Sequence, residues 1–146
     1  LPIGVYDSEY VIIAPHQVIY EPPLFLFSIL SSKIHFLWIK SVCGRLESRI
    51  RYSSALGYNT FPMITLSSDD KKKLELFALE ILDTRELFAD KTISQMYDPK
   101  NMPDKLLNCH LKIDEYLEKI YQIKSSSSDF EKVNVLLNLY KDKIQE

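Results

Sequence analysis

The residues best suited to recognise a ligand alternate along one short segment, from Glu47 to Tyr52. Alternate residues of a β-strand share a face, so a strand here places Glu47, Arg49 and Arg51 together, with roughly 6–7 Å between neighbours on that face. Arginine presents a planar donor fork that fits the two acceptors of guanine in the major groove, and glutamate accepts from the amino group of cytosine. A Glu-x-Arg pair can therefore read a C·G base pair.

The side chains around this segment suit contacts to DNA phosphates, which come mainly from basic and small polar residues. The candidates are Lys33, Lys40, Arg45, Arg51, Ser53 and Asn59. A simpler alternative stays open, because Glu47 and Arg49 on a solvated face also form an ion pair that binds nothing. The local sequence alone favours the ion pair.

The net charge of −2 conceals an uneven distribution. Residues 33–66 carry five basic residues and one acid, whereas residues 1–32 carry three acids and no Lys or Arg. Residues 67–146 hold the remaining 13 basic and 16 acidic residues. The basic middle is the part of the chain whose charge favours nucleic acid as a partner.

No pattern typical of catalysis occurs in the chain. The three glycines are isolated, which excludes a Gly-rich phosphate or cofactor loop. Cys109, His110 and Asp114 are too few to bind a metal, so ordinary hydrogen bonding is the favoured role of His110 and Asp114. Cys43 and Cys109 have no metal or redox spacing, which favours a reducing, cytoplasmic location. We predict no catalytic, cofactor or metal site in this chain.

The first half of the chain is predicted to combine short strands with one buried helix. It has the composition of a globular protein, with 46% apolar and 26% charged residues among 146. Strands are expected at residues 3–6, 11–14, 18–20, 47–52 and 58–61. Leu24 to Val42 reads as a helix that is apolar on most sides. Its apolar part contains Ser, Lys and His and falls short of the ~20 residues that span a bilayer, so no membrane partner is expected.

From Ser67 onward the pattern is helical. Ser67 with Asp70 and Ser128 with Glu131 are N-terminal capping signals. A short turn or helix is expected at residues 93–97, and a longer helix follows Pro103. The expected inward stripe of the last helix is Phe130, Val133, Leu137, Tyr140 and Ile144. The fold class is therefore α+β and mostly α, with short strands around a buried helix followed by a small helical bundle.

Ordered motifs run through almost the whole chain. They are Phe27–His35, Trp38–Ile39, Gly44–Ser53, Tyr58–Pro62, Leu82–Arg85, Met96–Pro99, Met102–Pro103 and His110–Asp114. Together they resemble the MmeI-like family of single-chain bacterial restriction–modification enzymes and related adenine-specific DNA methyltransferases. The chain departs from the family at Met63, where a Trp often follows the Pro. The start at Leu1, without an initiator Met or signal peptide, is interpreted as that of a fragment.

The resemblance implies two domains with different roles. Residues 1–66 correspond to the C-terminal part of a DNA target recognition domain, and residues 67–146 to a C-terminal helical domain. Glu47 and Arg49 match a base-reading pair, for which Lys-x-Asp is the other common pair in the family. The charge-swapped pair makes physical sense, because Lys donates to guanine and Asp accepts from cytosine.

The resemblance also implies the function. The chain is expected to recognise double-stranded DNA as a non-catalytic fragment of an S-adenosylmethionine-dependent adenine methyltransferase, with nuclease activity and Mg²⁺ as further options in the parent protein. The upstream methyltransferase domain of the same parent chain would be its partner and would bind the cofactor. The alternative is a helical protein-interaction or structural domain without catalysis.

Overall fold

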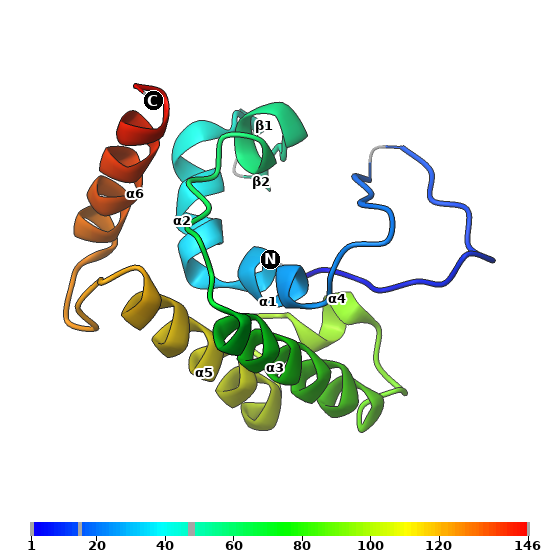
Figure 1. Cartoon of the computed structure of the whole chain (residues 1–146). Helices are drawn as coiled ribbons and strands as arrows, with labels where there is room; N and C mark the ends of the chain where they lie inside the picture. Colours follow the sequence, from blue (N-terminus) through cyan, green and yellow to red (C-terminus); the bar gives the residue numbers. More distant parts are fainter. Residues whose placement is uncertain (1, 15, 47–48, 146) are drawn as a thin grey trace.

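The computed structural model describes residues 2–14, 16–46 and 49–145, and it is mostly helical (Figure 1). In chain order the elements are α1 (Phe25–Ser31), α2 (Lys33–Val42), β1 (Arg45–Leu46), β2 (Arg49–Ile50), the π-helical turn η1 (Ser54–Tyr58), α3 (Ser68–Glu86), α4 (Ile93–Met96), α5 (Asp104–Ile120) and α6 (Asp129–Lys143). The predicted fold class, α+β and mostly α, is confirmed.

The apolar stretch after the two prolines forms two helices where the sequence predicted one. α1 and α2 meet at Ser32 with a bend of 57°. Ser32 is extended, and its side-chain oxygen accepts a hydrogen bond from the backbone N–H of His35, so it caps α2. A serine cap within an apolar run therefore breaks the helix.

Among the described residues, no single helix has the length and apolar character to cross a membrane, although α1 and α2 satisfy both criteria together across their bend.

One hydrophobic core joins the two halves of the sequence. Its fully buried side chains include Ile29, Trp38, Leu74, Ile81, Leu106, Ile113, Leu117 and Leu136. α1 packs on α3, which lies against α5, and α2 packs on α6 (Figure 1). Each fully buried side chain of this size contributes roughly 1.5–3 kcal/mol. The core thus fixes α2, the helix that leads into the basic segment.

The helix starts follow the sequence signals. Ser67 with Asp70 begins α3 and Ser128 with Glu131 begins α6, each as a reciprocal capping box. The inward face of α6 differs from the expected stripe, because Phe130 is 74% and Ile144 65% exposed while Leu136 and Lys132 are buried. Lys132 forms a buried ion pair with Glu118 of α5, which turns the adjacent face of α6 inward.

The predicted strands at residues 3–6, 11–14 and 18–20 are not found in the described residues, where this segment is irregular. A strand needs a neighbour for its backbone hydrogen bonds, and the described residues place none beside it. The predicted strand at residues 58–61 is also wrong. η1 occupies residues 54–58, with the side-chain oxygen of Ser53 accepting from the N–H of Leu56, and a turn follows.

Candidate nucleic-acid interface

The alternating basic residues lie on a short antiparallel hairpin and not on one six-residue strand. β1 and β2 pair Arg45 with Ile50 and Leu46 with Arg49. The N–H of Arg51 donates to the carbonyl oxygen of Gly44 at 2.9 Å, which extends the pairing by one step. Glu47 lies outside the described residues. The geometry of the Glu47–Arg49 pair therefore stays a prediction.

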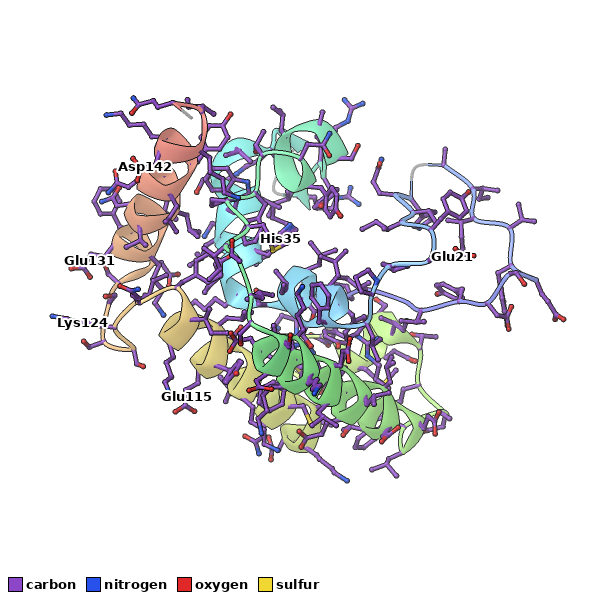
Figure 2. The ribbon with its side chains drawn as sticks, in the orientation of Figure 1. Glu21, His35, Glu115, Lys124, Glu131 and Asp142 are labelled. Atoms are coloured by element: carbon purple, nitrogen blue, oxygen red, sulfur yellow. The ribbon has the colours of Figure 1, made fainter. Side chains whose placement is uncertain are left out.

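α2 packs against η1, the turn that follows the hairpin. A Cβ added at Gly57 would come within 3.1 Å of both Cys43 Sγ and the Ile39 side chain, so η1 lies directly on α2. Tyr52 is half-buried with its ring 6.0 Å from that of His35, and burial raises the pKa of Tyr52 to about 12. Burial also lowers the pKa of His35, which lies at the centre of the molecule in Figure 2, to about 4. Both rings are therefore uncharged at neutral pH.

The basic side chains of the hairpin are exposed. Arg45, Arg49 and Arg51 are exposed, as are Lys40 near the end of α2 and Asn59 after η1. Residues 49 and 51 are two apart along the hairpin, so their side chains share a face. The structure thus brings five of the predicted contact residues to one end of α2.

Ser53 and Lys33 differ from this group. Ser53 is half-buried and caps η1, so its hydroxyl already has a local partner. Lys33 begins α2, about 10 Å along the helix axis from Lys40. Its ammonium lies 2.8 Å from the carboxylate of Asp129, and its backbone N–H donates to Asp114 at 2.7 Å. These contacts give Lys33 a structural role, and its phosphate contact stays a prediction.

Two lysines outside the predicted contact set lie at the end of α6. Lys141 and Lys143 lie in its last turn, and the ammonium of Lys143 donates to the carbonyl oxygen of Met63. Figure 1 shows α6 running beside α2, with its C-terminus on the side of the molecule that carries the hairpin. Their only signal in the sequence is a basic last turn, which also compensates the helix dipole.

Arg85, Tyr97 and His110 form a polar cluster with a structural role. Buried Arg85 donates to the hydroxyl of Tyr97 and, at 2.7 Å, to the carbonyl oxygen of Ile3. The Tyr97 hydroxyl lies 2.7 Å from Nε2 of His110, and burial lowers the pKa of His110 to about 4. Asp114 bonds elsewhere, to Lys33. His110 and Asp114 thus hydrogen-bond as predicted, and the described residues contain no group of three His, Cys, Asp or Glu that could hold a metal.

Comparison with known proteins divides the chain between two family models. The model described as "MmeI, target recognition domain" matches residues 1–65, and "MmeI, C-terminal domain" matches residues 66–146. The chain is similar to DNA methyltransferase A of Bacillus subtilis (strain 168), with 39% identity over 142 residues that cover 97% of this chain and 16% of that protein. A shorter match, 34% identical over 59 residues, is to the ubiquitin-like modifier-activating enzyme ATG7 of Kluyveromyces marxianus and covers 10% of that protein.

The fold is similar to a solved structure of the type IIL restriction–modification enzyme MmeI in complex with DNA. The TM-score is 0.83 at 35% sequence identity, over 86% of this chain and 17% of that one. The chain therefore spans about a sixth of the length of DNA methyltransferase A and of the solved enzyme.

Proposed function

The chain belongs to the MmeI family, and from that membership we propose that its hairpin recognises duplex DNA within a restriction–modification enzyme. The observation that carries the proposal is the set of exposed arginines, Arg45, Arg49 and Arg51, on a short hairpin between α2 and η1. A two-stranded ribbon fits the major groove, which is about 12 Å wide. The similar fold solved in complex with DNA supports the same assignment.

In the proposed mechanism, Arg49 donates to O6 and N7 of guanine, and Glu47 accepts from the amino group of the paired cytosine. The flanking side chains of Lys40, Arg45, Arg51, Ser53 and Asn59 contact phosphates and set the register of the hairpin on the duplex. Lys33 is the weakest member of this phosphate set, because Asp129 already holds its ammonium.

The proposed chemistry belongs to the rest of the parent protein. Residues 1–66 form the end of its target recognition domain, and residues 67–146 form a C-terminal helical domain that supports it. An upstream domain of the same chain binds S-adenosylmethionine, takes an adenine out of the duplex and methylates it. In this scheme, the hairpin decides which adenine reaches that domain.

A charge swap tests the base-reading role. In the full-length parent, Glu47→Lys combined with Arg49→Asp exchanges donor for acceptor, so the pair should read the reversed base pair. We expect the methylated site, mapped by long-read sequencing of exposed DNA, to change at one position and to keep its other bases. Lys105→Ala, at the first turn of α5 and away from the hairpin, serves as the control and should leave the site unchanged.

Two results would contradict the assignment. An unchanged site would show that another part of the protein reads that base pair. Loss of methylation at every sequence, in a variant that unfolds at the same temperature as the wild type, would show that the pair only anchors the DNA.

A further inference from the structure

The N-terminal segment (residues 2–14 and 16–21) exposes a run of large apolar side chains. Val11 is 87% and Tyr20 88% exposed. Val5, Tyr6, Tyr10, Ile13, Val18 and Ile19 are also exposed. In Figure 1 the segment forms a long dark-blue loop that extends away from the helices. A large contiguous apolar surface of this kind marks an interaction site.

The backbone of the N-terminal segment makes few hydrogen bonds in the described residues. Between residues 4 and 20, the backbone hydrogen bonds found in the described residues are local, from Tyr10 to Asp7 at 3.4 Å and from His16 to Ile13 at 3.3 Å. Val, Ile and Tyr, which prefer strands, make up much of the segment. It therefore has what a β-strand needs except a neighbouring strand.

Both ends of the N-terminal segment are attached to the helices. The carbonyl oxygen of Ile3 accepts from the buried Arg85 of α3 at 2.7 Å. At the other end, Glu21 turns the chain with a φ of 45°, and the carbonyl oxygen of Pro23 accepts from Leu26 at 2.9 Å. The intervening residues are thus presented as a loop with fixed ends.

A preformed turn folds this loop back on itself. The side chain of Asp7 accepts from the N–H of Glu9 at 3.0 Å, and its carbonyl oxygen accepts from Tyr10. The rings of Tyr6 and Tyr10, on either side of the turn, lie 5.3 Å apart. The residues on each side are thereby arranged to enter a sheet as adjacent extended runs.

We propose that residues 4–14 and 16–20 add as β-strands to an open sheet edge in the remainder of the parent protein. This chain covers only 16–17% of the length of its relatives, so the remainder of the parent protein is long enough to contain such a sheet edge. The segment carries Asp7, Glu9 and Glu21 and no Lys or Arg, so its charge disfavours DNA as the occupant. This inference does not depend on the DNA-reading role of the hairpin.

Hydrogen–deuterium exchange on the full-length parent tests the pairing. We expect the amides of residues 4–14 to exchange at least about 100-fold more slowly than in an unstructured peptide, because strand pairing buries them in hydrogen bonds. The protection should be the same at low and high protein concentration, and the same with and without duplex DNA.

Variants of the same parent sharpen the test. Val11→Lys places a charge on a side chain that strand addition would bury, so it should speed exchange across residues 4–14. Ser8→Lys, at the tip of the Asp7–Tyr10 turn, is the matched control and should leave exchange unchanged.

Three outcomes would overturn the proposal. Exchange at the unstructured rate would show that no strand forms. Protection that appears only at high concentration would assign the segment to a second copy of the protein, and protection that appears only with DNA would assign it to DNA. None of these results bears on the charge swap at residues 47 and 49, so the two proposals fail separately.

Discussion

At the scale of single residues, Asp114 joins parts of the fold that are far apart in the sequence. Its carboxylate accepts the N–H of Lys33 at the first turn of α2, and Glu118 and Lys132 lie close enough to influence its charge. Burial raises the pKa of Asp114 to about 6 against the opposing hydrogen bond from Lys33, and the charge of Glu118 adds to the rise. The folded protein therefore holds this proton more tightly than the unfolded chain does.

The sign of the pH dependence follows from that difference. A carboxyl group with a raised pKa favours the folded state below its unfolded pKa of about 4, and this contribution is lost as the pH rises through 6. Asp114→Asn keeps an oxygen that accepts from Lys33 and removes the charge. We expect the variant to exceed the wild type in stability at pH 7 by at most about 2–3 kcal/mol, and the difference to vanish near pH 4.

Urea unfolding of both proteins at each pH measures this difference. The comparison has to be made between the proteins and not along one pH profile. His35 and His110, whose pKa values burial lowers to about 4, weaken the folded state of both proteins as the pH falls below 6.5. A variant less stable than the wild type at pH 7 would show that α2 requires the ionised carboxylate at its start.

At the scale of elements, the sequence predicts what is decided locally. The starts of α3 and α6 were predictable because each capping box uses two residues only three positions apart, such as Ser67 and Asp70. The inward face of α6 was not, because Lys132 is buried only through Glu118 of another helix. The break at Ser32 was missed because a serine within an apolar run leaves the hydrophobic pattern intact.

In the candidate site, too, the residue types were predictable from the sequence, and the contacts between distant segments were not. The residue types of the hairpin, and their basic surroundings, could be recognised from the sequence alone. The separation of Lys33 from that group could not, because its partner Asp129 lies on α6, far away in the chain. Likewise, the antiparallel pairing of β1 with β2 is a contact between segments that the alternation of residues 47–52 does not reveal.

The ion pair between α5 and α6 gives a prediction at the element scale. Glu118 and Lys132 are 8% and 6% exposed in their side chains, so Lys132→Met leaves a buried carboxylate without a partner. We expect it to lower the free energy of unfolding by about 3–5 kcal/mol, and Glu118→Leu added to it to recover most of that loss. Urea titration of the single and double variants measures both steps.

The surface pair of Lys112 with Glu80 provides the matched control. It joins α5 to α3 with side chains 52% and 39% exposed, so Lys112→Met should change stability little. Equal losses from the buried and the exposed pair would show that burial does not set the strength of the contact between α5 and α6.

At the scale of the whole molecule, the arrangement of charge matters more than its total. An acidic apolar segment projects from one side, and the exposed arginines gather on the hairpin at the end of α2. In Figure 2, Glu115 on α5 and Glu131 and Asp142 on α6 point outward from the helical part. The hairpin therefore gathers exposed basic residues suited to a polyanion, despite the net charge of −2.

The salt dependence of DNA binding by the full-length parent tests this surface. If Lys40, Arg45 and Arg51 each neutralise one phosphate, they contribute about −3 to the slope of log K against log salt concentration. Arg51→Gln should make the slope shallower by about 1 and weaken binding to all sequences alike, because a phosphate contact carries no base information.

Lys105→Gln, remote from the hairpin, should change neither quantity. An unaltered slope in Arg51→Gln would show that Arg51 makes no phosphate contact. Binding without any salt dependence would favour the alternative in which the helical part docks on another protein, because counterion release is the necessary consequence of phosphate neutralisation.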